Sequence, residues 1–202
     1  MNKTKQMLVF VLAMGLITSF LLVGVSLLTR ERILANQQAA LQSAILQAND
    51  IAFTAGEVNE IFNDRIEVIE LEEEGSDTPL VFFRHPASGN ISFQFEGGGV
   101  WGPIIGVITL EDDFKTIVEI TILEQEETPG LGGIITERAY LNNYVGAHLS
   151  ESITISHDSV PGDPNYVDAI TGGTRTSERF ETILRTAYQR RADVWRTFAE
   201  EE

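Results

Sequence analysis

The chain has 202 residues, with 14 lysines and arginines against 30 aspartates and glutamates, which gives a formal net charge of −16. Nucleic-acid binding needs many phosphate contacts from Lys and Arg, so this acidic composition excludes a nucleic-acid partner. Cysteine is absent, which excludes disulfides, thiolate metal sites and iron–sulfur ligation by this chain. His85, His148 and His157 are isolated and share no ligand-like spacing, so we expect no metal site.

A long run without charged residues lies near the N-terminus, over residues 6–29. As a helix it would reach about 36 Å, which is enough to cross the hydrocarbon layer of a membrane with some tilt. A cleaved signal peptide is the alternative, but its apolar core is about 7–15 residues long and ends at a small-x-small site. This run is longer and continues into Thr29-Arg30-Glu31-Arg32 without such a site. We expect a retained span with no ionisable residue in its core, and therefore no ion path formed by this helix alone.

The charges on either side of this run predict its orientation. Lys3, Lys5 and the terminal amine precede it, whereas Arg30, Glu31 and Arg32 sum to +1 after it. The positive-inside rule then places the N-terminus in the cytoplasm. We expect a single-pass protein of the cell inner (cytoplasmic) membrane, in contact with membrane lipid, with its acidic domain outside the cytoplasm.

Three segments are predicted along the chain. Residues 1–32 form the cytoplasmic N-terminus and the single transmembrane helix. Residues 33–56 form a stalk helix and linker, because apolar side chains continue at mostly helical intervals until Thr54-Ala55-Gly56, which is typical of a break. Residues 57–202 form the soluble domain.

The pattern of the soluble domain predicts an α+β fold. A short helix is expected over Glu57–Asp64. Alternating apolar residues separated by turns then predict strands at residues 66–69, 80–83, 91–95, 104–110, 116–123 and 152–156. A helical segment is expected over 140–145, a Pro/Gly turn over 160–165, and a long final helix from about Thr176. The buried stripe of that helix is expected to comprise Phe180, Ile183, Leu184, Ala187, Tyr188, Val194, Trp195 and Phe198. The fold class is therefore an antiparallel sheet flanked by helices.

Three glycine-bearing loops occur in this one domain, over residues 96–103, 126–133 and 168–177. Glycine is favoured where the backbone must turn or approach another group closely, so each loop alone is typical of a turn. Together they indicate a pocket for a flat ligand that carries a phosphate. Trp101 is either a stacking partner for such a ligand or a core residue. Glu127 either contacts the polar edge of the ligand or caps a turn.

The third loop runs directly into the final helix. Thr171, Gly172, Gly173 and Thr174 lie before or at the expected helix start, and Thr176 begins the helix. The first amides of a helix have no partners within it and carry the positive end of its dipole, so they bind anions. Arg175 and Arg179 lie near enough to help neutralise a phosphate. The alternative is a glycine turn capped by Thr176 or Ser177.

These residues resemble the paired motifs of bacterial FMN-binding electron-transport subunits. Glu127-Thr128-Pro129-Gly130-Leu131-Gly132 and Asp168-Ala169-Ile170-Thr171-Gly172-Gly173-Thr174 occur here in the order of that family. The family includes the G subunit of the Rnf ferredoxin:NAD oxidoreductase and the related C subunit of the sodium-translocating NADH:quinone reductase. The run from Leu28 to Gln38 is similar to the membrane-exit segment of the Rnf subunit, and Gly99–Ile104 is similar to a segment of both. The short length favours the Rnf subunit.

The resemblance implies a covalently bound flavin. In the family a dedicated flavin transferase joins the phosphate of FMN to the threonine that ends the second motif, which is Thr174 here, with Thr176 as the fallback acceptor. Asp168 matches the acid that opens the transferase motif. The other matched residues, Glu127 and Thr128, belong to a loop that lies beside the flavin in the family.

The function implied by the resemblance is electron carriage through this FMN, as a redox subunit of an ion-translocating, Rnf-type complex. We expect no catalytic residue and no substrate turnover by this chain alone, and we expect the other subunits of the complex as partners. Gly173 departs from the family pattern, which usually has Ala there, but it still allows the backbone to present Thr174. The alternatives are the corresponding subunit of the sodium pump, a stand-alone FMN-dependent oxidoreductase, and a non-flavinylated, membrane-anchored binding or scaffold module.

Overall fold

A computed structural model describes residues 2–73, 75–150, 153–156 and 162–201. Helix α1 (Lys3–Ala48) is continuous, and the chain divides into two units within it, Met1–Ala39 and Ala40–Glu202. In the first unit, the apolar side chains of α1 are exposed, and the length and composition of the helix satisfy the requirement for a membrane span. The predicted stalk residues continue this helix to Ala48. The predicted domain boundaries stay a prediction.

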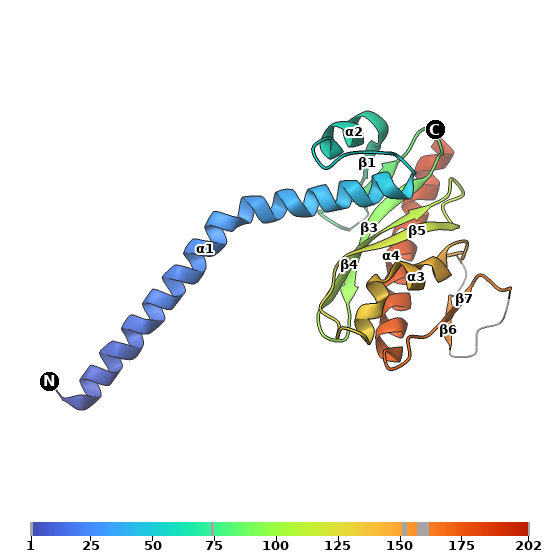
Figure 1. The fold of residues 1–202 in the computed structure, drawn as a ribbon. Helices are drawn as coiled ribbons and strands as arrows, with labels where there is room; N and C mark the ends of the chain where they lie inside the picture. Colours follow the sequence, from blue (N-terminus) through green and yellow to red (C-terminus); the bar gives the residue numbers. More distant parts are fainter. Residues whose placement is uncertain (1, 74, 151–152, 157–161, 202) are drawn as a thin grey trace. The chain divides into compact units, whose positions relative to one another are not determined.

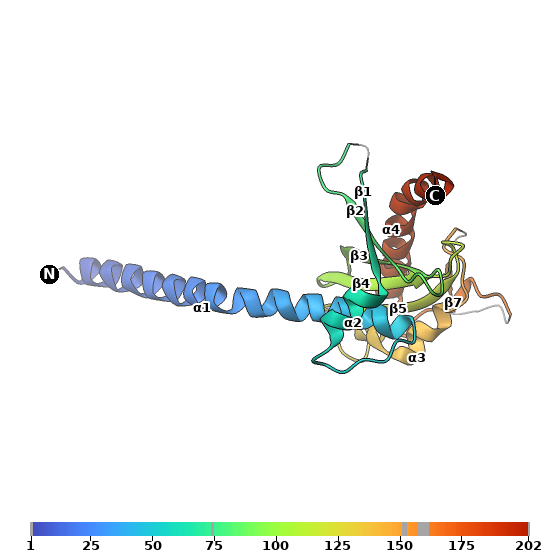
Figure 2. The same ribbon diagram turned by 90° about the horizontal axis from the view of Figure 1, so that it is seen from above.

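Five strands form an antiparallel sheet in the second unit, in the order β1-β2-β3-β4-β5. Figure 1 shows the sheet, and all five strands are labelled in Figure 2. The strands are β1 (Glu67–Leu71), β2 (Leu80–Arg84), β3 (Ile91–Gly98), β4 (Pro103–Leu110) and β5 (Ile117–Glu124). All five were predicted, because alternation of apolar residues is a strong signal when both faces of a strand pack against helices. The short helix α2 (Val58–Arg65) precedes them, also as predicted.

Each face of the sheet has its own apolar cluster. Adjacent residues of one strand point to opposite faces, so Phe82 belongs to one cluster and Phe83 to the other. The first cluster packs against α4 (Thr174–Glu201), and the second packs against the end of α1 and α2. Figures 1 and 2 likewise place α2 and α4 on different sides of the sheet.

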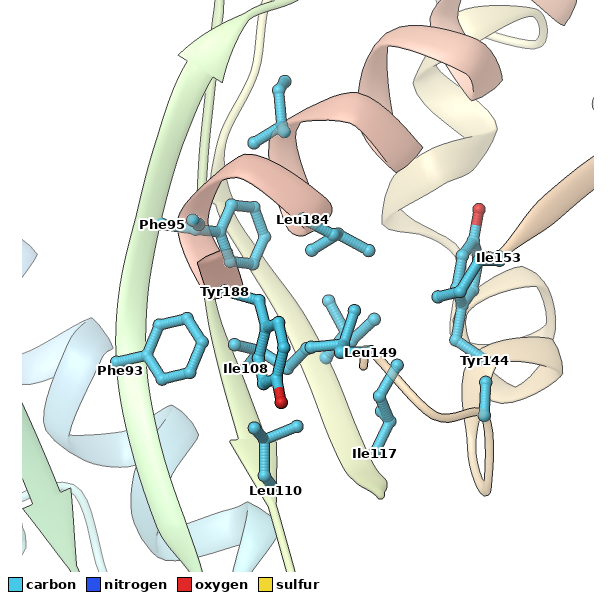
Figure 3. Close-up of a cluster of buried hydrophobic side chains, with 14 of the residues drawn as sticks. Phe93, Phe95, Ile108, Leu110, Ile117, Tyr144, Leu149, Ile153, Leu184 and Tyr188 are labelled. Carbon is cyan, nitrogen blue, oxygen red and sulfur yellow. The ribbon is translucent and has the colours of Figure 1, made fainter. Parts of the chain in front are cut away.

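The stripe predicted for the final helix makes the larger core. Figure 3 shows Phe93 and Phe95 of β3 facing Leu184 and Tyr188 of α4. Most of the predicted stripe is buried; Val194 and Phe198 are partly buried at its end. This packing fixes the position of α4 and of its N-terminus.

The region between β5 and α4 was predicted less well. It contains the 3-10 helices η1 (Gly132–Thr136) and η2 (Asn142–Tyr144), the short helix α3 (Arg138–Leu141), and a parallel pair, β6 (Thr154–Ser156) with β7 (Tyr166–Asp168). The prediction missed β7 and η1, because three to five residues carry too little periodicity. It also started α4 two residues too late. Residue 152 of the predicted strand and residues 160–161 of the predicted turn lie outside the described part of the chain.

Candidate functional site

A cavity of about 390 Å³ lies where the three glycine-bearing loops meet. It is lined by Val100, Trp101, Glu127, Thr128, Leu131, Gly132, Gly172, Gly173, Thr174, Arg175 and Thr176. These residues come from the β3–β4 loop, the segment after β5, and the start of α4. The structure therefore brings together three segments that lie far apart in the sequence, and the cavity contains most of the predicted cofactor-binding residues.

Glu127 joins these three segments. Its carboxylate Oε1 accepts hydrogen bonds from the backbone N–H groups of Val100 (2.7 Å) and Trp101 (3.1 Å). Its Oε2 accepts a hydrogen bond from Oγ1 of Thr176 (2.7 Å). Glu127 is only 4% exposed, and a buried carboxylate is stable only when its oxygens are hydrogen bonded, as they are here. Glu127 therefore links the three segments by hydrogen bonds at the cavity.

Two glycines allow the three segments to pack closely around Glu127. A Cβ atom added at Gly132 would lie 2.5 Å from Oγ1 of Thr176 and 2.7 Å from Oε2 of Glu127, so no side chain fits there. Gly172 has a φ of 76°, a left-handed conformation that other residues rarely adopt. It makes the turn that leads into α4.

The start of α4 contains three hydroxyl groups with different environments. Thr174 is the first residue of the helix, is half-buried and lines the cavity. Thr176 is buried and donates to Glu127, whereas Oγ of Ser177 is buried and accepts the backbone N–H of Ile170 (3.0 Å). The two deeper hydroxyls thus stabilise the turn. Thr174 is the half-buried residue of the three and lines the cavity.

Trp101 and Arg175 lie at the surface of the cavity. The indole of Trp101 is 71% exposed, so the alternative that it is a core residue is wrong. An exposed tryptophan beside a cavity offers a flat apolar face to a ligand. Arg175 is exposed and lines the cavity, whereas Arg179, which is also exposed, does not line it.

Two predicted site residues lie outside the cavity lining. Thr171 is exposed in the turn before α4, and Asp168 is exposed at the end of β7, where it pairs with Ser156 of β6. The prediction also missed the apolar lining residues Val100 and Leu131. The glycines next to them in the sequence were the signal that could have placed these two residues in the cavity lining.

His85 and His148 belong to no cluster of possible metal ligands among the residues that the structure describes. Among those residues there is no group of three or more histidine, aspartate or glutamate side chains that could hold a metal ion. His157 lies outside the described residues.

Comparison with known proteins identifies relatives of this domain. Residues 99–189 match the model of the FMN-binding domain family. The chain is 34% identical to the C subunit of the Na(+)-translocating NADH-quinone reductase of Yersinia pestis over 87 residues, which are 40% of this chain and 33% of that protein. It is 32% identical to the same subunit of a Neisseria meningitidis serogroup A strain over 95 residues, 45% of this chain and 37% of that protein. The aligned part therefore spans about a third of the length of these relatives.

Two solved structures share the fold. The C subunit of the Na(+)-translocating NADH-quinone reductase from Parabacteroides distasonis superposes with a TM-score of 0.66 and 25% identity, covering 80% of this chain and 94% of that one. NqrC from Shewanella oneidensis superposes with a TM-score of 0.66 and 20% identity, covering 76% and 93%. The cavity described above falls within the matched residues 99–189.

Proposed function

We propose, from the match of residues 99–189 to the FMN-binding domain family, that this chain is a membrane-anchored electron carrier whose FMN is covalently bound to Thr174. The observation that carries the proposal is the position of Thr174. It is the first residue of α4, and it lines a cavity built from three glycine loops.

The residues of the cavity have the chemistry that a flavin mononucleotide requires. The first-turn amides of α4 and the guanidinium of Arg175 favour a phosphate. Trp101, Val100 and Leu131 provide aromatic and apolar surface for a flat ring system. Both kinds of group line one cavity, together with Thr174.

Each part of the chain then has a separate role. Bound FMN supplies the redox chemistry, by accepting and donating electrons. The hydroxyl oxygen of Thr174 would form the ester to the phosphate by displacing the leaving group that the phosphorus carries in an activated flavin nucleotide. The hydroxyl proton would be lost as that group departs, in a reaction that a flavin transferase would catalyse. Glu127 holds the Trp101 loop against the start of α4, because it bonds both segments. The ester would prevent loss of the cofactor, so the chain could serve as an electron carrier. By itself, the chain is proposed to turn over no substrate.

The membrane helix and the relatives support a place in a larger complex. The proposed topology is a single pass through the inner membrane, with the N-terminus in the cytoplasm and the flavin domain outside. The relatives are subunits of an enzyme whose name states that it translocates Na⁺. The proposed partners are therefore the other subunits of an ion-translocating oxidoreductase, either the sodium-translocating NADH:quinone reductase or the related Rnf complex.

The test is the mass and fluorescence of the full chain after co-expression with a flavin transferase. We expect an FMN adduct and flavin fluorescence that survives denaturing electrophoresis, and we expect both to be lost in Thr174→Ala. Thr182→Ala is the matched control, because Thr182 is an exposed threonine of the same helix that lies outside both the loop motif and the cavity lining. Adduct loss in Thr176→Ala but not in Thr174→Ala would move the acceptor by two residues.

Two other results would contradict the proposal. An unmodified mass in cells that flavinylate other proteins would favour a scaffold or binding module. Reduction of the flavin by a soluble substrate, with the purified chain alone, would favour a stand-alone oxidoreductase.

A further inference from the structure

A second, larger cavity of about 900 Å³ lies away from the flavin site, where β2 and β3 separate. It is lined by Leu41, Thr78, Pro79, Leu80, Val81, Phe83, Gln94, Phe95, Glu96, Gly97, Gly98, Pro103, Thr186, Ala187, Arg190 and Arg191. None of these residues lines the flavin cavity. The two cavities are therefore separate, and the proposed FMN site does not include this one.

The cavity exists because β2 and β3 pair over only two residue pairs. Their register includes Phe83 with Ser92 and Arg84 with Ile91, whereas β3 pairs with β4 along its whole length. Beyond Ser92, the two strands diverge. The sheet is therefore split from one end, between its second and third strands.

The split leaves backbone groups of β3 without a strand partner. The N–H of His85 bonds the carbonyl of Asn90, so even-numbered residues of β3 direct their backbone groups toward β2. For Gln94, Glu96 and Gly98, the described part of the chain has no strand on that side. Unpaired backbone of this kind is a template for an added strand.

The two walls of the split differ in charge. The wall on the α4 side carries Arg191 and also Arg190, whose guanidinium is ion-paired with both carboxylate oxygens of Glu73. The opposite wall carries Leu41 and Phe83, with Glu96 beside them. An added strand has side chains that alternate between the two walls.

Arg191 is incompletely satisfied. Its guanidinium lies 4.9 Å from the centre of the Phe93 ring, and its Nη1 donates to the backbone carbonyl of Ala187 (3.1 Å). Its Nε is buried and has no hydrogen-bond partner among the described residues. Burial, and next the nearby Arg190, lower the pKa of Arg191 to about 10, while Glu73 opposes the change. The group is thus charged at neutral pH, and a carboxylate beside it would be favourable.

We propose that this split in the sheet binds an extended segment of a partner subunit as an additional β-strand, with a carboxylate facing Arg191 and apolar side chains facing Leu41 and Phe83. Glu96 sets this orientation, because it repels carboxylates from the opposite wall. The inference does not depend on flavin attachment at Thr174. It gives the chain a second surface for assembly into a complex.

The test uses the full chain in detergent and a defined probe, the capped peptide Val-Glu-Val-Glu-Val. Binding is followed by NMR, together with hydrogen exchange of individual amides. We expect the amides of Gln94 and Glu96 to become protected, because strand addition gives each a carbonyl partner. We also expect the peptide Val-Lys-Val-Lys-Val to bind at least about tenfold more weakly, because a lysine of it would face Arg191.

Two variants and a matched control separate the contributions. Arg191→Gln removes the charge and should weaken binding of the acidic peptide by about tenfold. Gln94→Pro removes one amide that faces the split and should weaken binding by a similar factor. Glu70→Pro is the control, because Glu70 is exposed on the edge strand β1 and its amide faces away from β2. The control should bind the peptide like the unchanged chain.

Several outcomes would overturn the proposal. Protection of Val68 and Glu70 instead of Gln94 and Glu96 would show strand addition at the edge of the sheet. Chemical-shift changes at Leu41 and Phe83 without amide protection would show an apolar ligand or detergent in the cavity. Equal affinity for the acidic and basic peptides, or no binding of either, would also refute the proposal. If Gln94→Pro fails to fold, the Arg191→Gln result and the amide protection pattern decide the question.

Discussion

Replacing Glu127 with alanine tests whether one carboxylate holds together the three segments around the cavity that Thr174 lines. The substitution leaves the hydroxyl of Thr176 and the amides of Val100 and Trp101 without their acceptor. An unsatisfied buried donor costs about 1–3 kcal/mol. Thr176 is only 3% exposed and should bear the full cost, while the two partly buried amides can gain water and should cost less. The free energy of unfolding should therefore fall by about 2–4 kcal/mol.

The assay is a thermal melt of the full chain in detergent, followed by near-ultraviolet circular dichroism of the tertiary packing. For a domain of this size about 1 kcal/mol shifts the Tm by roughly 2–4 °C, so Glu127→Ala should melt about 5–15 °C lower. Glu127→Gln should lose only about 1 kcal/mol, because one oxygen still accepts and the amide nitrogen can donate to Thr176. The yield of covalent flavin should fall in the same order.

Glu126→Ala is the matched control for this series. Glu126 is adjacent in sequence but exposed, so its replacement should change stability by less than about 0.5 kcal/mol. A Glu127→Ala chain that melts within about 2 °C of this control and keeps its full flavin yield would refute the stabilising role of the Glu127 hydrogen bonds. The cavity would then be held by packing of its loops alone.

Two further predictions concern strand β4 and the turn that joins it to β5. Gly106→Ala should destabilise the domain by about 2–3 kcal/mol in chemical denaturation, because the new Cβ would overlap the ring of Phe95 and lie 2.6 Å from a backbone oxygen of β5. Gly98→Ala is the control and should be near neutral, because its Cβ would meet nothing within 4 Å. Equal effects of the two substitutions would contradict this packing. Burial raises the pKa of Asp113, but hydrogen bonds from the amides of Thr116 and Lys115 and the hydroxyl of Thr116 outweigh it and lower the pKa below the ordinary 3.8. The carboxylate therefore stabilises the fold above pH 3.8 and loses this effect as the pH falls further. Asp113→Asn should cost less than about 1 kcal/mol at pH 7, because the residue is exposed, and a gap that widened in acid would contradict the sign.

Elements with a strong period could be predicted from the amino-acid sequence alone, and so could the likeness of residues 99–189 to the FMN-binding domain family. Alternating apolar residues indicated all five strands of the large sheet, and the stripe from Phe180 to Phe198 indicated α4, because burial of a strand or helix face requires the matching period. The resemblance pointed to the FMN-binding domain family, whose model matches residues 99–189, because the two loop motifs occur in the order of that family. Flavin attachment at Thr174 and the place in a complex stay predictions.

How the loops meet, in contrast, became known only from the folded chain. No sequence pattern indicated that Glu127 bonds Val100 and Thr176, because hydrogen bonds between distant segments depend on how α4 packs on the sheet. Sequence reasoning likewise could not show that Trp101 is exposed while Thr176 is buried. The short strand β7 and the split between β2 and β3 could not be predicted either, since neither leaves a periodic pattern. Both depend on which strands find partners, and that is settled by long-range packing rather than by local sequence.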